Sequence, residues 1–318
     1  MQKCDRYAIK TLKIPGLILM ENAGRGVVDL IEKTYGTVFG KKFIVVCGKG
    51  NNGGDGFVIS RHLFVRGGIV TTVLIGKANE LKNDTKLNYT ILSNLEQKYG
   101  SSQKLKILVS YNRKKLSVLP KCDLIVDALL GTGFKGSVKE PQLGVIRWMN
   151  NRTEKKVSVD IPSGVDADTG IIGNDAVAAW LTATMGFRKN GTTIGSGRDY
   201  AGKVDVIDIS FPEEISRNIE PYSFIVGIND VKNILPKRRW DAHKHSVGKI
   251  LILAGSRGMT GAAAMTAQAT MKAGAGSVIL GTPKSVYPIL AKKLTEVMVE
   301  PLPETEDGTL SLDAYDFV

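Results

Sequence analysis

The chain contains the segment Gly48-Lys49-Gly50-Asn51-Asn52-Gly53-Gly54-Asp55-Gly56 directly after the apolar run Phe43-Ile44-Val45-Val46-Cys47. A short β-branched run, a glycine-rich turn and apolar positions at helical spacing over 56–65 predict a strand, an anion-binding loop and a helix. Glycines let backbone N–H groups approach a phosphate closely, and a helix N-terminus adds partial positive charge. The segment therefore predicts a nucleotide-type ligand at the end of this strand.

The side chains of this loop exceed what phosphate binding requires. Asn51, Asn52 and Asp55 place three oxygen-bearing groups in the turn, although Asp55 could also simply cap the following helix. An NAD dehydrogenase of the Rossmann type would need an acidic residue near the end of the second strand, where 74–77 reads Leu-Ile-Gly-Lys. The missing carboxylate argues against hydride-transfer chemistry.

Composition places the chain among globular proteins of a reducing compartment. It has 318 residues, 43% hydrophobic and 23% charged, which predicts one large or two smaller domains. Three cysteines without framework spacing, no signal-type N-terminus and no run long enough to span a bilayer predict a cytoplasmic protein without a membrane partner. The net charge of +12 is spread out, with basic clusters at 113–115 and 237–239 and no interleaved aromatics, so no nucleic-acid partner is expected.

Strand-like and helix-like patterns alternate to about residue 210. This alternation predicts an α/β fold, a three-layer αβα domain of Rossmann-like type with a mostly parallel, doubly wound sheet. Polar or glycine-rich segments follow four apolar runs, at 48–56, 127–137, 160–166 and, less clearly, 186–197. Because ligands bind outside the carboxyl ends of such strands, these segments are expected to meet in one crevice.

A second unit is predicted from about residue 225, after a proline-punctuated stretch with Pro212, Pro221 and Pro236. Residues 249–253 and 277–280 read as strands and 262–273 as a helix. About 90 residues with so few strands would make a poor closed α/β domain. We therefore expect this part to be incomplete and to expose apolar surface.

Two further carboxylates are expected at strand ends. Asp127 ends the run Leu124–Asp127 and precedes a glycine loop, and Asp160 follows the apolar Val157 and Val159. Partial burial would raise the pKa of Asp160 and suit proton transfer, whereas the alternative for each is a solvated or turn-capping Asp. Asn52, Asp127 and Ser163 together form an all-oxygen set suited to a hard cation.

The motifs at 51–56, 127–134 and 159–166, in this order along the chain, resemble those of the NAD(P)H-hydrate epimerase family. The resemblance extends from near residue 1 to about 212. Residues 225–318 resemble the opening of the ADP- or ATP-dependent NAD(P)H-hydrate dehydratase, a ribokinase-like domain, so the whole chain is similar to bifunctional NAD(P)H-hydrate repair enzymes. The matching segments are 51–56, 127–134, 159–166, 14–17 and 20–25, then 243–244, Gly248, 255–256 and 259–263.

The resemblance implies an epimerase domain over 1–212, a linker over 213–224 and a dehydratase part over 225–318. It implies that hydrated NADH or NADPH is bound, that K⁺ takes oxygen ligands from Asn52, Asp127 and Ser163, and that the protein forms a homo-oligomer. The implied substrate-binding residues are Asn51, Asn52, Gly53, Gly54, Asp55, Gly131, Thr132, Gly133, Phe134, Lys135, Gly136, Ser137 and Asp160.

Two departures from the family pattern stand out. Lys49 occupies a position where the family commonly has proline, and the late Gly-x-Gly-Asp segment that holds the dehydratase base does not occur before Val318. ADP or ATP would therefore serve a dehydratase domain only if it were completed.

We expect epimerisation of hydrated NAD(P)H with Asp160 as the proton-transfer residue. By transferring a proton, Asp160 would let the hydroxyl on C6 of the nicotinamide ring leave and return, or let the ring open and close. Lys135 and a bound water are both candidates for its partner in proton transfer. The rivals are a non-catalytic nucleotide-binding module with the same fold and a dehydrogenase that uses the loop for NAD.

Overall fold

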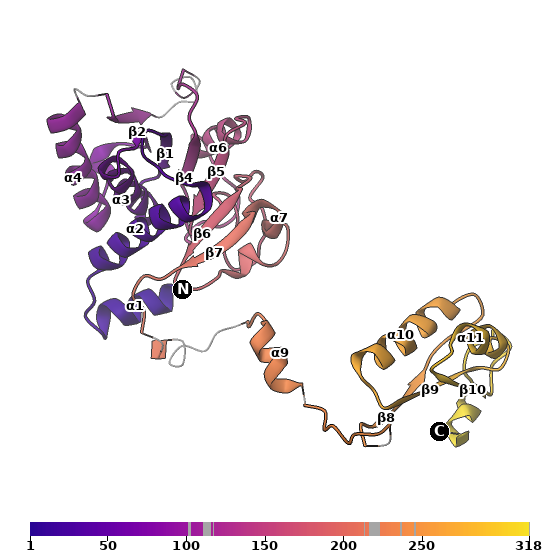
Figure 1. The fold of residues 1–318 in the computed structure, drawn as a ribbon. Helices are drawn as coiled ribbons and strands as arrows, with labels where there is room; N and C mark the ends of the chain where they lie inside the picture. Colours follow the sequence, from indigo (N-terminus) through magenta and orange to yellow (C-terminus); the bar gives the residue numbers. More distant parts are fainter. Residues whose placement is uncertain are drawn as a thin grey trace. The chain divides into compact units, whose positions relative to one another are not determined.

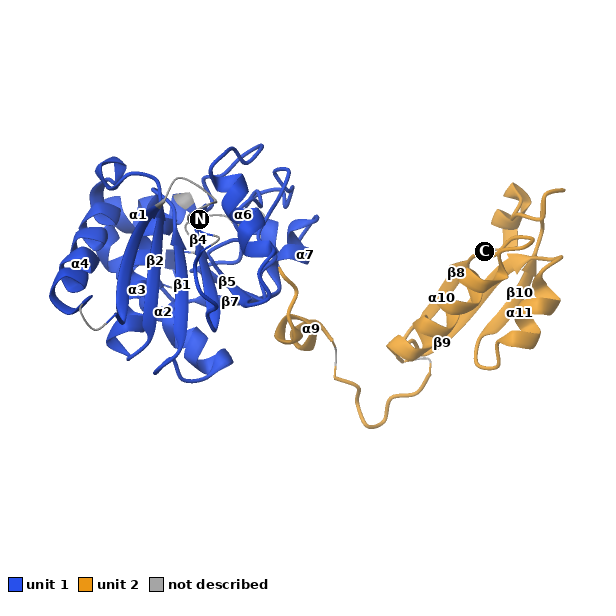
Figure 2. Cartoon of the chain, turned by 90° about the horizontal axis from the view of Figure 1, so that it is seen from above, with its two compact units in different colours: residues 1–224 blue, residues 225–318 orange. Residues whose placement is uncertain are grey.

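The computed structural model describes all residues except 101–102, 111–115, 117, 213, 216–222, 236, 245 and 318. Its described residues divide into two compact units, Met1–Phe224 and Ile225–Val318 (Figure 2). The expected basic cluster at 113–115, Pro221, Pro236 and most of the expected linker 213–224 lie outside the described residues.

Unit 1 is built on a parallel sheet, seven-stranded in its described part, with the order β3-β2-β1-β4-β5-β6-β7 (Figure 1). The predicted doubly wound α/β fold is therefore confirmed. The strands are β1 (Lys42–Cys47), β2 (Ile69–Ile75), β3 (Leu105–Ser110), β4 (Leu124–Ala128), β5 (Lys155–Val159), β6 (Leu181–Met185) and β7 (Lys203–Ile207). The helical segments are α1 (Gln2–Lys10), α2 (Gly16–Tyr35), α3 (Asn51–Val65), η1 (Ala78–Glu80), α4 (Asn83–Tyr99), α6 (Gln142–Asn150), η3 (Asn190–Thr192) and α7 (Gly197–Ala201).

Alternation along the strands divides the core into two layers. In β1, Val45 and Cys47 belong to a buried cluster with α2, α3 and α4, while Ile44 and Val46 belong to a second cluster with α6. Successive side chains of a strand point to opposite faces, so one fully buried strand supplies both layers. The result is the three-layer arrangement, with helices on both sides of the sheet.

The first glycine-rich segment differs from the prediction. Helix α3 begins at Asn51, not near residue 56, and its N-cap is Gly50, so the interpretation of Asp55 as the helix cap is wrong. Residues 52–54 are buried, and this tertiary packing overrides the low helix propensity of the paired glycines. A Cβ on Gly53 would lie 1.9 Å from the carbonyl oxygen of Gly48.

Unit 2 forms a smaller parallel sheet of order β10-β9-β8 in its described residues. Its cluster of buried side chains joins α10 and α11 to one face of β9, whereas Ile250, Leu251 and Leu253 of β8 are about half exposed. The elements are α9 (Ile228–Ile234), β8 (Lys249–Leu253), α10 (Thr260–Ala273), β9 (Ser277–Pro283), α11 (Tyr287–Lys293), β10 (Met298–Leu302) and η4 (Leu312–Phe317).

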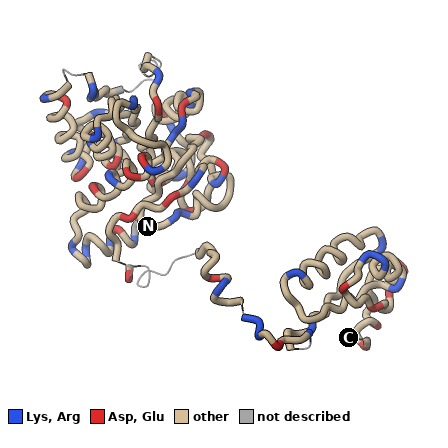
Figure 3. Tube along the Cα trace, viewed as in Figure 1, with Lys and Arg blue, Asp and Glu red and all other residues tan. Residues whose placement is uncertain are grey.

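Lys and Arg are scattered along both units among acidic residues (Figure 3). Within the described ranges, no helix is long and apolar enough to cross a membrane.

The contact between Gly53 and Gly48 gives a stability prediction. Gly53→Ala should lower the free energy of unfolding by about 2 kcal/mol or more, because the new Cβ has a position fixed by the backbone and the carbonyl oxygen that it meets is itself backbone, so neither can rotate away. Gly50→Ala is the matched control in the same loop, since a Cβ there meets nothing within 4 Å, and should cost less than about 1 kcal/mol.

Urea denaturation followed by tryptophan fluorescence measures both variants. Trp148 and Trp180 lie in unit 1, whereas Trp240 is 98% exposed and changes its environment little on unfolding. Equal losses in the two variants would show that the close approach of Gly53 to Gly48 is not needed.

Candidate functional site

A cavity of about 590 Å³ opens at the carboxyl ends of the central strands. In the observed strand order the connections run in opposite directions on either side of β1 and β4, which is where ligands bind in doubly wound sheets. Three of the predicted segments line it, represented by Asn51, Asn52 and Asp55 of α3, by 129–134 after β4, and by Asp160 after β5. The predicted convergence of these segments is therefore observed.

Asp160 is held in a strained and well-defined conformation. Its backbone has φ = 68°, in the left-handed region that non-glycine residues seldom occupy, and its N–H donates to the Ala183 carbonyl (2.7 Å). Its Oδ1 accepts hydrogen bonds from the Met185 N–H (3.0 Å) and the Thr184 hydroxyl (3.4 Å), both at the end of β6. A strand-end carboxyl is thus fixed at the cavity wall.

The cationic partner of Asp160 is Lys189. The Lys189 ammonium donates to Asp160 Oδ1 and to the Met185 carbonyl (2.8 Å), and its side chain is only 4% exposed. Lys135, one of the two partners considered from the sequence, instead pairs with Asp166 (3.0 Å) and Asp168 (2.6 Å). Lys189 was missed, although it lies in the segment 186–197 that follows an apolar run.

Three more aspartates, Asp5, Asp55 and Asp84, line the same cavity. Asp55, half-buried on α3, has a pKa raised well above its usual range by burial and by the nearby charges of Asp160 and Asp5, with Lys189 acting the other way. Burial, followed by the charge of Asp160, also raises the pKa of Asp5 on α1. Sequence reasoning missed α1 and Asp5, because nothing in 2–10 marks them as part of a site.

Asp127 lies beneath the cavity, fully buried at the end of β4. Its Oδ1 accepts from the Ser163 hydroxyl (2.6 Å) and the Leu129 N–H (3.3 Å), and its Oδ2 from the Ser158 hydroxyl (2.8 Å) and the Ser163 N–H (2.9 Å). Burial raises the pKa of Asp127, while these hydrogen bonds act in the opposite direction.

Asn52 joins this buried group through Leu130. The Asn52 amide donates to the Leu130 carbonyl (2.9 Å), and the Leu130 N–H donates to the Ser163 hydroxyl (2.8 Å). The remaining atom, Asn52 Oδ1, is buried and has no hydrogen-bond partner in the described part of the chain. In those same residues no group of three His, Cys, Asp or Glu side chains could hold a metal.

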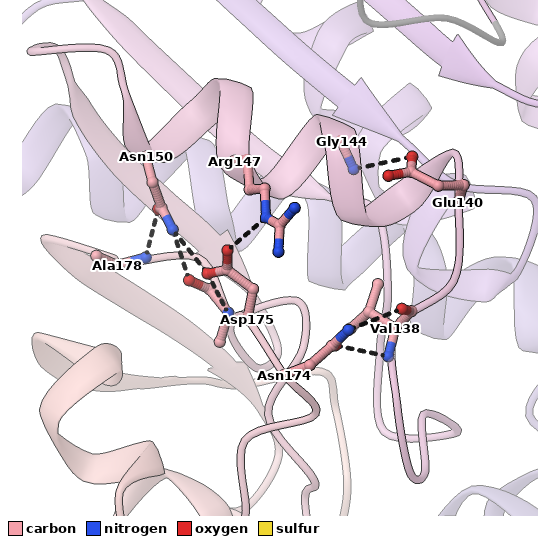
Figure 4. A network of polar contacts seen from close by, with 9 residues as sticks. Val138, Glu140, Gly144, Arg147, Asn150, Asn174, Asp175 and Ala178 are labelled. Carbon is pink, nitrogen blue, oxygen red and sulfur yellow. Dashed lines mark hydrogen bonds and ion pairs between the residues drawn. The ribbon is translucent and has the colours of Figure 1, made fainter.

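The predicted loop 131–137 is only partly at the cavity. Residues 131–134 line it, whereas Lys135, Gly136 and Ser137 do not. Its far end is anchored at Val138, whose N–H donates to Asn174 Oδ1 (3.0 Å) while the Asn174 amide donates to the Val138 carbonyl (3.3 Å; Figure 4).

The next residue, Asp175, extends the same anchor to α6. Its carboxylate accepts a hydrogen bond from Arg147 (3.3 Å) and lies next to Asn150, whose side-chain oxygen accepts from the Ala178 N–H (2.9 Å; Figure 4). These contacts hold the far end of the loop in place.

Gly53 and Gly54 of α3 do not line the cavity; a Cβ on Gly54 would meet Met20. These two glycines therefore allow close packing of the backbone.

Two family profiles match the chain. The family described as YjeF-related protein N-terminus matches residues 16–191, and the family described as NAD(P)H-hydrate dehydratase matches residues 250–318.

Two curated relatives are each named bifunctional NAD(P)H-hydrate repair enzyme Nnr. The protein of Moorella thermoacetica is 38% identical over 317 residues, and that of Salinibacter ruber is 38% identical over 320 residues. Each alignment covers 99% of this chain and 59% of the relative, so the chain spans about three fifths of the relatives' length. The expectation that 225–318 is incomplete is not supported by these alignments, which extend over nearly the whole chain.

A solved structure agrees with the fold. The crystal structure of the yeast protein YNL200c is 24% identical and superposes with a TM-score of 0.56, covering 70% of this chain and 93% of that chain. Residues 250–318 match the NAD(P)H-hydrate dehydratase family. Because the first profile extends over more than half of the chain and contains the three converging segments, the chain belongs to the family of YjeF-related protein N-terminus domains.

Proposed function

We propose that unit 1 interconverts the R and S forms of hydrated NADH and NADPH. The observation that carries this proposal is the Asp160 carboxyl, fixed by a left-handed backbone and a buried ammonium at the wall of a cavity that also contains Asp55. The printed name of the relatives, a repair enzyme for hydrated NAD(P)H, supports the choice of substrate.

The chemistry needs one proton donor and one proton acceptor. The C6 hydroxyl gains a proton and leaves as water while the N1 lone pair forms a C6=N1 double bond. Water then adds to the opposite face of C6, the π electrons return to N1, and the added water loses a proton. Asp55, whose raised pKa favours the protonated form, suits the donor role, and Asp160 beside its ammonium suits the acceptor role.

The remaining expected residues would bind the dinucleotide. Asn51 and the backbone of 131–134 line the cavity, and the N-terminus of α3 directs N–H groups toward an anion. Lys135, Gly136 and Ser137, set off from the cavity, would contact more distant parts of the substrate. The segment 250–318 would contribute to a dehydration that uses ADP or ATP. The formation of a homo-oligomer and the absence of nucleic-acid and membrane partners stay predictions.

Potassium fits the oxygen set beneath the cavity on one structural ground. Asn52 Oδ1 is a buried carbonyl oxygen without a partner among the described residues, and such an atom suits a hard cation. Asn52, Asp127 and Ser163 would hold the ion. When bound, it would supply a fixed positive charge for the anionic dinucleotide.

Asp160→Asn tests the catalytic assignment. The amide cannot accept the proton, so epimerisation should fall at least about 100-fold while the affinity for the hydrate changes little. The assay supplies the R hydrate with a separate S-specific dehydratase and follows NADH absorbance. Asp29→Asn, which changes an exposed carboxylate paired with Arg66, is the control.

The same assay separates the rival functions. Wild-type protein that binds the hydrate without turnover would identify a binding module. Oxidation or reduction of NAD(H) with a second substrate and no dehydratase would identify a dehydrogenase. An active Asp160→Asn variant would remove Asp160 from the mechanism.

Asp55 gives a pH dependence of stability. Between the pKa of an unfolded Asp, about 4, and its raised folded pKa, the folded state keeps a proton that the unfolded chain has lost. Stability therefore falls as pH rises through this interval, by up to about 1.4 kcal/mol per unit. Asp55→Asn should become progressively more stable than wild type from pH 4 upward, in urea denaturation at matched pH values; a difference independent of pH would contradict the raised pKa.

Removing potassium tests the cation set. Replacing KCl by tetramethylammonium chloride at equal ionic strength should lower the melting temperature of the full chain, since K⁺ at ten times its dissociation constant stabilises by about 1.4 kcal/mol. Asn52→Ala should abolish this K⁺ response. Equal melting temperatures for wild type in the two salts would exclude the site.

A further inference from the structure

We propose that Lys189 is a positioning residue for the proton transfer: its buried ammonium holds Asp160 as a carboxylate and fixes which of its oxygens faces the substrate. This inference rests on the proposed epimerase function and gives the buried lysine beside Asp160 a role of its own in that function.

The burial of Lys189 is the first step of the argument. Its side chain is 4% exposed, and burying an ammonium is costly unless the charge is paired and hydrogen-bonded. The ammonium meets this need with the Asp160 carboxylate and the Met185 carbonyl (2.8 Å). A lysine that served only solubility would lie on the surface, where its ammonium loses no hydration. The burial of this ion pair therefore requires an explanation.

The hydrogen bonds divide the two oxygens of Asp160. Lys189, the Met185 N–H and the Thr184 hydroxyl all donate to Oδ1. Among the described residues no hydrogen bond reaches Oδ2, and Asp160 lines the cavity. Oδ2 is therefore the oxygen that accepts the proton, while Oδ1 fixes the orientation of the carboxylate.

The surrounding charges make the ammonium necessary. Asp5 and Cys4 of α1, the N-terminal amino group of Met1 just before α1, and Asp55 of α3 lie within electrostatic range. Asp160 raises the pKa of both Asp5 and Asp55, so its negative charge is felt by two other carboxyls. Without Lys189, Asp160 would lose its contacting cation next to these other acidic groups.

A structural role for Lys189 is the alternative. Its bond to the Met185 carbonyl closes the turn between β6 and η3, and this contact alone could explain its burial. A structural anchor and a positioning residue differ in what they affect: the first determines stability, whereas the second determines turnover through Asp160.

The experiment uses four variants of the full chain in the epimerase assay. Lys189→Met removes the charge and keeps the length, and should lower kcat at least about 100-fold with KM within about threefold. In an Asp160→Asn background, adding Lys189→Met should lower activity no further, because the two residues act as one unit. Lys203→Met removes an exposed lysine paired with Asp205 (2.7 Å) and should keep wild-type kcat.

Lys189→Ala carries the second test, which does not depend on how well Lys189→Met folds. Propylammonium replaces the missing part of the side chain and should raise the activity of Lys189→Ala at least about tenfold. Tetramethylammonium, which cannot donate a hydrogen bond, should not raise it. Thermal denaturation of each variant establishes that it is folded.

The outcomes separate this inference from the proposed function. Wild type that epimerises the hydrate, with Lys189→Met at wild-type kcat or with additive losses in the double variant, would overturn the role of Lys189 alone. A folded Lys189→Ala variant with no response to propylammonium would do the same. Wild type without epimerase activity would overturn both proposals.

Discussion

The buried Asp127 carboxylate is the interaction on which the site depends. Its four hydrogen bonds join the end of β4 to Ser158 of β5 and to Ser163 in the next loop. Through Leu130, the same group reaches Asn52 at the start of α3. A buried carboxylate without these donors would cost several kcal/mol, so the three segments are held together by the need to satisfy one charge.

The sequence predicts the frame of this arrangement well. Apolar runs followed by glycine or carboxylate residues identify β1, β4 and β5. The rule that ligands bind at strand ends brings Asn52 and Asp160 to one crevice, whereas Asp127 is fully buried and does not line it. These predictions succeed because each depends on local pattern and on the topology of parallel sheets. Side chains that carry oxygen at strand ends are recognisable without coordinates.

Other features depend on tertiary packing and could not be predicted. Helix α3 begins at Asn51 although its own glycines have a low helix propensity. Glycine is favoured there because the close contact with Gly48 leaves no room for a side chain. Lys189 resembles any surface lysine in sequence, and only the fold shows that its ammonium is buried against Asp160. Helix α1 adds Asp5 to the cavity from a part of the chain that carries no motif.

The cavity combines these predictable and unpredictable parts into a division of charge. Four aspartates line the cavity, Asp5, Asp55, Asp84 and Asp160, and the buried Lys189 ammonium pairs with Asp160 among the described residues. Burial raises the pKa values of Asp5 and Asp55, and the negative charge of Asp160 raises both further. A single buried lysine therefore distinguishes Asp160 from its neighbours of the same residue type: Asp160 has a contacting cation, whereas burial and the charge of Asp160 raise the pKa values of Asp5 and Asp55.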